Sequence, residues 1–374
     1  MPSLLPRSLL FGLLAGFVLP LAATAYQPPV HRDDGWAVAD AHAMHWDLSR
    51  FAALEGKLAD GGYKGITSVV VVQNGKLVYE NYFNGGGLDR LNDIRSASKS
   101  VTALLVGAAI DRGLISNVQA RVYDFFPDKQ PVQHPDKRKR AITLEDLLTM
   151  SSLWECNDEN EFSSGNEERM YVSEDWLQFA LDLPIKGFAP WMDKPKDSPY
   201  GRAFSYCTAG AFVAGAVVEQ ATRKPLADFA AETLEHPLGI TQVHWNSSPL
   251  GIGMGGGGTR YRSRDLAKLG ELALDGGRWQ GKQVISKTWI QAMLTQHAQA
   301  RDDADYGYFW WRFRFPLKGV EQPVWAMSGN GGNYVFMMPA QGLVAVITST
   351  AYNQRYAHPQ SQEIFRDYIL KALP

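Results

Sequence analysis

The chain has 374 residues, of which 45% are hydrophobic and 20% are charged. These values are typical of globular proteins and exclude an intrinsically disordered chain. The formal net charge is only −2. The sequence therefore lacks the basic excess of a nucleic-acid-binding surface, and we expect no nucleic-acid partner.

The first 25 residues have the pattern of a secretory signal peptide. Arg7 is their only charge, 8–22 is almost continuously apolar, and Ala23-Thr24-Ala25 has the small residues that signal peptidase requires. We predict a signal peptide at 1–25, a mature chain from Tyr26, and export to the periplasm. An uncleaved membrane anchor is the alternative. No other stretch approaches the roughly 18 apolar residues of a membrane helix, so we expect no stable membrane span after cleavage.

The mature chain is predicted to open with a helix and a hairpin. Apolar residues recur at helical spacing over 46–59, before Gly61-Gly62 ends the helix. Two β-prone runs, 67–73 and 76–82, then flank Asn74-Gly75. An Asn-Gly dipeptide between two such runs is a strong signal for a β-hairpin.

A second helix is predicted from Ser96 to Gly113. Its centre, 101–110, carries no charge, which is typical of a helix buried on every side. The following part, about 114–300, is expected to be helical with long loops. Its predicted features are a capped helix start at Thr143, a polar, acidic loop at 157–169, helices at 173–183, 209–221 and 264–274, and a glycine-rich segment at 251–258.

The glycine-rich segment 251–258 contains six glycines in eight positions but lacks the Gly-Lys-Ser/Thr ending of a phosphate-binding loop. It therefore predicts a flexible wall or a close backbone approach.

The end of the chain returns to β-structure. The predicted elements are strands at 306–314, 324–328, 333–338 and 343–348 and a closing helix at 360–373. Strands at both ends of the chain around a helical middle predict an α+β fold. We expect one antiparallel sheet built from both termini and flanked by helices, with an inserted, mainly helical lobe. The expected division is a single domain at 26–374, with an α/β lobe at about 26–113 and 301–374 and a helical lobe at about 114–300.

Ser96 and Lys99 are the first candidates for chemistry. On a helix, residues three apart lie on one face, so the lysine amine can reach the serine hydroxyl. A serine at a helix N-terminus also has a free backbone N–H, which could bind an oxyanion. The apolar helix behind Lys99 favours the neutral amine, the form that can act as a base. The spacing alone occurs by chance about once in such a chain, so Ser96 could equally be only a helix cap.

The surrounding sequence favours the chemical interpretation. Residues 93–107 (DIRSASKSVTALLVG) resemble the nucleophile helix of the penicillin-recognising serine hydrolases, which include class C β-lactamases, DD-peptidases, esterases and 6-aminohexanoate-dimer hydrolases. Residues 204–210 (FSYCTAG) are similar to the second motif, Tyr-x-Asn, and 328–334 (SGNGGNY) stand where the third belongs. Further similar segments are 142–153, 262–270 and 306–311. The chain most resembles the 6-aminohexanoate-dimer hydrolase and esterase branch.

The resemblance implies roles for individual residues. Ser96 would be the nucleophile, Lys99 its activating partner, and Tyr206 a proton carrier, although Tyr206 could also be a packed aromatic residue. Asn330 would supply the second oxyanion N–H. The oxyanion and substrate-binding residues expected from the resemblance are Ser328, Gly329, Asn330, Tyr171 and Thr208.

Two positions depart from the family pattern. Thr208 stands where the second motif has Asn, and Met327 or Ser328 stands where the third has Lys. The missing lysine removes the usual cation for a β-lactam or peptide carboxylate. We therefore expect a hydrolase of small esters, amides or short peptides that needs no cofactor. The alternatives are a weak β-lactamase, a D-amino-acid carboxypeptidase or penicillin-binding protein, and a catalytically inactive binding or scaffold relative.

The two cysteines, Cys156 and Cys207, can pair only with each other within the chain. In an oxidising compartment we favour a disulfide over two free, buried thiols. A bridge would tie the acidic loop, which could attract a substrate amine or simply be solvated, to Tyr206. His42 and His45 have no accompanying acidic or cysteine ligands, so no metal site is expected.

Overall fold

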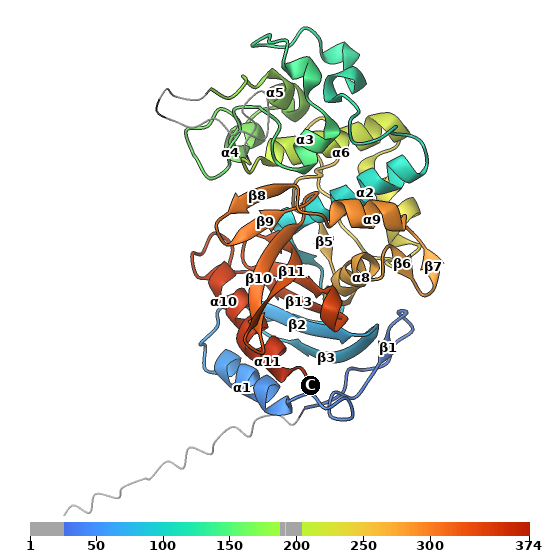
Figure 1. Ribbon diagram of the computed structural model, residues 1–374, viewed down its shortest axis with the longest axis vertical. Helices are drawn as coiled ribbons and strands as arrows, with labels where there is room; N and C mark the ends of the chain where they lie inside the picture. The colour runs from blue at the N-terminus through green and yellow to red at the C-terminus, as the bar shows by residue number, and fades with distance from the viewer. Residues whose placement is uncertain (1–25, 188–190, 192–203) are drawn as a thin grey trace, which may run out of the picture.

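The computed structural model describes residues 26–187, 191 and 204–374, and the predicted signal peptide lies outside them. The expected α+β fold is confirmed. A nine-stranded sheet, in the order β1-β3-β2-β13-β12-β11-β10-β9-β8, is flanked by helices (Figure 1). All neighbouring strands are antiparallel except β1 and β3. The strands of this sheet are β1 (Ala37–Val38), β2 (Ile66–Gln73), β3 (Lys76–Tyr82), β8 (Ala298–Arg301), β9 (Ala304–Tyr306), β10 (Trp311–Leu317), β11 (Val320–Gly329), β12 (Asn333–Met338) and β13 (Leu343–Ser349).

The helices and the short elements complete the description. The α-helices are α1 (Leu48–Ala59), α2 (Ser98–Asp111), α3 (Leu144–Leu148), α4 (Glu167–Tyr171), α5 (Trp176–Asp182), α6 (Thr208–Thr222), α7 (Leu226–Ala230), α8 (Ser263–Leu274), α9 (Lys287–Met293), α10 (Ala357–Glu363) and α11 (Leu370–Ala372). The other short elements used below are the 3-10 helix η1 (Arg95–Ala97), the π-helix η7 (Ile364–Ile369), and the strand pair β4 (Asn92–Asp93) and β5 (Arg260–Tyr261).

The two ends of the chain meet where β2 pairs with β13, in a register that places Val70 opposite Val346. Successive side chains of a strand point to opposite faces of a sheet. Val69 and Val71 join a core that α1 and η7 cover, whereas Val70 and Val72 join a second core beneath α8 and α2. A strand buried on both faces needs a continuous apolar run, which the four consecutive valines provide.

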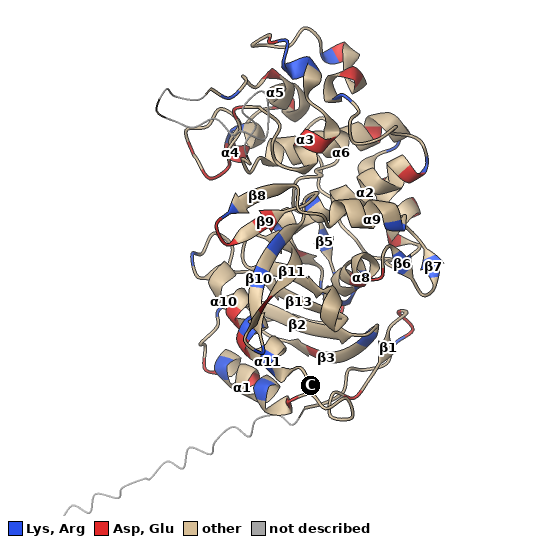
Figure 2. Ribbon diagram, in the orientation of Figure 1, with Lys and Arg blue, Asp and Glu red and all other residues tan. Residues whose placement is uncertain are grey.

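The helices α3, α4, α5 and α6 lie together at one end of the molecule, in its upper part in Figure 1. Helix α6 packs against α2, α3 and α5. In Figure 2, α2 and α6 are drawn almost wholly tan, since charged residues occur only near their ends. The predicted cap of α3 is present, because the Thr143 side chain accepts the Asp146 N–H and the Asp146 carboxylate accepts the Thr143 N–H.

Three local predictions need correction. The second helix is expected to start near Ser96, and α2 begins two residues later at Ser98; Ser96 lies in η1, directly before α2 and after Arg95, which has a left-handed φ of 50°. The single strand predicted over 306–314 is wrong. There β9 and β10 form a hairpin, in whose turn the Gly307 N–H donates to the Trp310 carbonyl. The polar loop predicted at 157–169 ends in the short helix α4, which Asn166 caps.

Two elements of the region predicted as a helical lobe, 114–300, pack on the sheet or form part of it. Helix α8 lies on β2, β12 and β13, and β8 forms an edge of the sheet. Nothing in the described part of the chain is a helix long and apolar enough to cross a membrane. The separation into two lobes within one domain stays a prediction.

Candidate active site

Ser96 lies in the turn between β4 and α2. The Arg95 carbonyl just before it accepts hydrogen bonds from Ser98 Oγ at 2.7 Å and from the Gly258 N–H at 3.3 Å. Asp93 Oδ1 accepts the Arg95 N–H at 3.0 Å. These contacts hold Arg95 in its left-handed conformation, which is uncommon for a residue with a side chain and is often found at functional sites. Among the described residues the Ser96 N–H has no hydrogen-bond acceptor, so it is free to bind a ligand.

Lys99 is buried, with 1% of its side chain exposed, beneath the Ser96 hydroxyl. Its Nζ donates to Ser96 Oγ at 2.8 Å and to the Gly256 carbonyl at 2.6 Å. The hydrogen bond to the Gly256 carbonyl brings the glycine-rich segment 251–258 close to Lys99. A Cβ on Gly256 would lie 2.9 Å from the Thr208 side chain and 3.0 Å from its carbonyl. Of the two interpretations of this segment, the structure therefore supports a close backbone approach.

Tyr206 lies just before α6 and faces the same lysine. The centroid of its ring is 5.0 Å from Lys99 Nζ. The ring also stacks on Trp311 of β10, with centroids 5.8 Å apart. The structure thus brings the three predicted catalytic residues together from two parts of the chain more than 100 residues apart, and Trp311 fixes the orientation of the tyrosine.

The predicted third motif lies at the end of β11, against the turn that carries Ser96. A Cβ on Gly329 would lie 2.0 Å from the Ile94 carbonyl and 3.1 Å from the Ala97 nitrogen, so only glycine allows this approach. The Asn330 side chain is held by two hydrogen bonds with Asn353, at 2.5 and 2.8 Å. The Asn330 N–H donates to no described residue and is therefore free, like that of Ser96.

Two connected hollows meet at Ser96. One, of about 420 Å³, is lined by Ser96, Asp158, Glu159, Glu167, Tyr206, Arg301, Trp311, Phe313, Ser328, Gly329, Asn330, Tyr334, His358 and Gln362. The other, of about 240 Å³, contains Tyr171, which is 38% exposed and donates its hydroxyl to Glu167 at 3.0 Å. Asn330 and Glu167 line both. Volumes of this size suit a small molecule.

Thr208 is the one predicted substrate-binding residue that the structure does not place in these hollows. Its side chain is 1% exposed, and its hydroxyl has no hydrogen-bond partner among the described residues. The Thr208 side chain, at the start of α6, packs against Gly256. The structure therefore does not support the prediction that Thr208 contacts the substrate, because its side chain stays within the core.

The predicted disulfide between Cys156 and Cys207 is present, with an S–S distance of 2.01 Å. It joins the acidic loop to the residue that follows Tyr206. Two hydrogen bonds strengthen the same junction. Ser205 Oγ donates to the Cys156 carbonyl at 2.6 Å, and the Asp158 N–H donates to the Tyr206 carbonyl at 2.9 Å. The segment that carries Tyr206 is thus held at three points.

Asp158 belongs to the acidic loop, which the sequence indicated could attract a substrate amine or simply be solvated, and its contacts beside Tyr206 were not predicted. Its Oδ2 accepts the Thr208 N–H at 2.6 Å, and its Oδ1 accepts the Glu167 N–H at 3.0 Å. Burial raises the pKa of Asp158 to about 6, although the Lys99 charge acts in the opposite direction. Its position two residues after Cys156 was a usable signal, since a bridge to Cys207 brings Asp158 close to Tyr206.

His358 was also missed by the sequence reasoning. It lines the larger hollow, and its Nδ1 lies 2.7 Å from the Tyr334 hydroxyl. Burial, together with the nearby Arg301, lowers the pKa of His358 to about 4. The imidazole is therefore neutral at pH 7. Nothing in the local sequence indicated that His358, which lies just before the predicted closing helix, would line a cavity.

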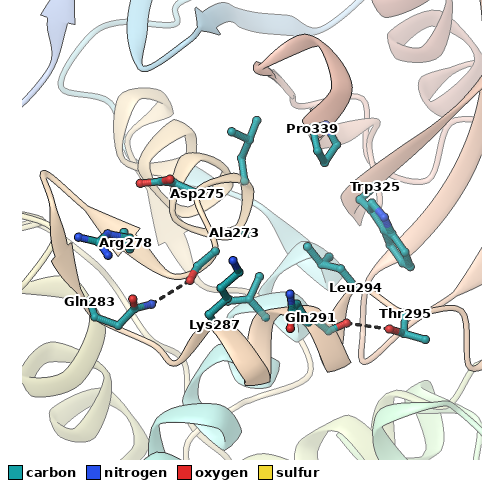
Figure 3. A pocket seen from close by; sticks show the side chains of 13 residues that line it. Ala273, Asp275, Arg278, Gln283, Lys287, Gln291, Leu294, Thr295, Trp325 and Pro339 are labelled. Carbon is teal, nitrogen blue, oxygen red and sulfur yellow. Dashed lines mark hydrogen bonds between the residues drawn. The ribbon is translucent and has the colours of Figure 1, made fainter.

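A separate hollow of about 680 Å³ lies between α8, α9 and β11 (Figure 3). Three of its polar side chains, those of Arg278, Gln283 and Thr295, donate to backbone carbonyls. Thr295 Oγ1 donates to the Gln291 carbonyl at 2.7 Å, and Gln283 Nε2 donates to the Gly276 carbonyl at 2.8 Å. The described residues that line it include no serine or cysteine. We therefore place the candidate active site at Ser96. Within the described ranges, no three His, Cys, Asp or Glu side chains gather as a metal site.

Comparison with known proteins agrees with this geometry. Residues 50–365 match the beta-lactamase family. The 6-aminohexanoate-dimer hydrolase of Paenarthrobacter ureafaciens is 24% identical over 320 residues, which cover 85% of this chain and 76% of that protein. A penicillin-binding protein homolog from Caulobacter crescentus superposes with a TM-score of 0.64 at 18% identity, covering 90% of this chain and 99% of its own. A family VIII carboxylesterase gives a TM-score of 0.62 at 19% identity, covering 89% and 98%. With its family match over most of its length, the chain belongs to the beta-lactamase family of serine hydrolases.

Proposed function

We propose that this protein is an exported hydrolase that cleaves an ester or amide bond of a small molecule through an acyl-enzyme on Ser96. Ser96 Oγ attacks the substrate carbonyl carbon, and its proton passes to Lys99. The proton then passes by way of Tyr206 to the leaving group, which departs as an alcohol or amine. Water attacks the resulting ester of Ser96, gives a proton to the same groups, and releases a carboxylic acid and the free serine.

The observation that carries the proposal is the 2.8 Å contact between Lys99 Nζ and Ser96 Oγ. This distance lies within the range required of a nucleophile and its base. Lys99 is almost fully buried at the foot of an almost uncharged helix. Tyr206, whose ring lies beside Lys99 and which lines the cavity, would carry the proton toward the substrate through its hydroxyl.

Two backbone N–H groups support the assignment of an oxyanion site. Those of Ser96 and Asn330 have no acceptor among the described residues, and Gly329 brings their two segments into contact. Two converging N–H donors stabilise the negative oxygen of a tetrahedral intermediate, and loss of one such donor typically costs about 10²–10³-fold in rate.

The third motif bears on the choice of substrate. Met327, which stands where the family's lysine would be on one alignment, is fully buried in β11. No amine from that position can bind the carboxylate of a β-lactam. We therefore favour small esters and amides over penicillins, in line with the 6-aminohexanoate-dimer hydrolase and carboxylesterase among the similar proteins.

Mass spectrometry tests the proposal. The protein is treated with a fluorophosphonate, a β-lactam and a panel of p-nitrophenyl esters, and adducts are located by peptide mapping. We expect fluorophosphonate and ester labelling at Ser96 and none in Ser96→Ala. Absence of label at Ser96 with every reagent would sink the proposal, and stable labelling by the β-lactam would favour a penicillin-binding protein. N-terminal sequencing of the secreted protein tests export, for which we expect Tyr26 as the first residue.

A further inference from the structure

The acidic loop crosses the second motif at Asp158. This residue forms hydrogen bonds through three of its groups. Its N–H donates to the Tyr206 carbonyl, and its two carboxylate oxygens accept the N–H groups of Thr208 and Glu167. These contacts join the segment before α6 and the start of α6 to the start of α4, so Asp158 is one of the groups that hold the segment carrying Tyr206.

The charges around Asp158 come from each element packed against it. Lys99 of α2 attracts its negative charge, and Glu167 of α4 repels it. The Tyr171 hydroxyl of α4 also lies within its electrostatic reach. Tyr206 contributes its backbone carbonyl from the segment before α6. Among these groups, Lys99, which becomes an ammonium when it takes the Ser96 proton, is the one whose charge a carboxylate can balance.

On the basis of the proposed function, we propose that Asp158 is a positioning residue of the acyl-transfer site. Its ionised carboxylate holds the start of α6, two residues after Tyr206, against α4, and it balances the charge that Lys99 acquires with the Ser96 proton. Thr208 cannot take this role, since its side chain is buried and lines neither hollow.

Only the ionised form of Asp158 can both hold the start of α6 against α4 and balance the charge of Lys99. A carboxylate accepts hydrogen bonds at both oxygens, and here both oxygens face N–H donors. Protonation places an O–H against one of these donors, breaks that hydrogen bond and removes the charge opposite Lys99. Since burial raises the pKa of Asp158 to about 6, we expect activity to fall as the pH drops through this value. Asp158→Asn mimics the protonated form, because its NH₂ group also faces a donor.

The test compares Asp158→Asn with wild type in p-nitrophenyl ester hydrolysis from pH 5 to 9. Wild type is expected to show an acid limb with a midpoint near 6. The variant should lack this limb, and its kcat should be about 10- to 100-fold lower at pH 8 with little change in KM. Its kcat at pH 8 should be similar to the low kcat that wild type reaches at pH 5, the acid end of the range. Glu161→Gln, an exposed neighbour in the same loop, is the matched control and should keep the wild-type profile.

A purely structural role of Asp158 would lower the melting temperature without moving the pH profile. The inference is overturned if Asp158→Asn keeps the wild-type limb and kcat. If the variant does not fold, wild type alone decides, since a flat profile between pH 5 and 7 overturns the inference. The Ser96→Ala variant distinguishes a failure of the proposed function from a failure of the role of Asp158. If Ser96→Ala is active, the proposed function fails. If Ser96→Ala is inactive and Asp158→Asn behaves as wild type, only the role of Asp158 fails.

Discussion

The close approach of Gly329 to the turn that carries Ser96 makes Gly329→Ala an informative substitution. The new Cβ would lie 2.0 Å from the Ile94 carbonyl oxygen, whereas such a C···O contact normally requires about 3.3 Å or more. The end of β11 and η1 must therefore separate by about 1.3 Å. Both segments carry a proposed oxyanion donor, and a displacement of about 1 Å at a reacting centre can cost about 100-fold in rate. Overpacking of this kind costs about 1–3 kcal/mol in folding free energy, so the variant should still fold.

The assay measures kcat/KM for a p-nitrophenyl ester, the rate of fluorophosphonate labelling and the melting temperature. We expect kcat/KM and the labelling rate to fall about 100-fold, with a modest loss of stability. Gly56→Ala is the matched control. Gly56 lies on the exposed side of α1 with nothing within 4 Å of its added Cβ, so activity should be unchanged and stability should rise by up to about 1 kcal/mol. A Gly329→Ala enzyme with wild-type kcat/KM would refute the reasoning.

Three further substitutions test separate features. Lys99→Met keeps the bulk of the side chain but removes the amine that contacts Ser96, so we expect kcat for ester hydrolysis to fall by about 10²–10⁴-fold in steady-state assays. Replacing Cys156 and Cys207 by serine opens a bridge across a sequence separation of 51, worth about 4 kcal/mol by loop entropy, and should lower the urea unfolding midpoint. Burial raises the pKa of Glu271 to about 7, from an ordinary value of 4.5. Its contribution to stability is present below the unfolded value and is lost as the pH rises through the folded one, so Glu271→Gln should be more stable than wild type at pH 8 in urea titrations.

Each of these has a contrary outcome. Wild-type kcat in Lys99→Met would remove the lysine from the proposed mechanism. Two free thiols in the unfolded, unreduced protein would show that the bridge does not form. An unchanged slope of stability against pH between about 4.5 and 7 in Glu271→Gln would mean that this carboxyl ionises normally in the folded protein.

The sequence by itself determined the elements whose burial follows a local period. The valine-rich run at 67–73 predicted the strand β2, and Asn74-Gly75 predicted the hairpin that follows it. Thr143 predicted the start of α3 through its own capping hydrogen bonds. These signals are local, since the residues involved lie within a few positions of one another. The Ser96 and Lys99 pair was visible for the same reason, although its spacing alone had little weight.

Only the tertiary structure decided how distant segments meet. The left-handed Arg95 is held in part by a hydrogen bond from Gly258, more than 150 residues away. The burial of Thr208 and the contacts of Asp158 depend on how the acidic loop crosses the start of α6. The physical reason is that periodicity reports the burial of a residue within its own element. Packing between elements decides which groups a buried carboxylate bonds and where two backbone segments approach closely. No local pattern encodes this packing.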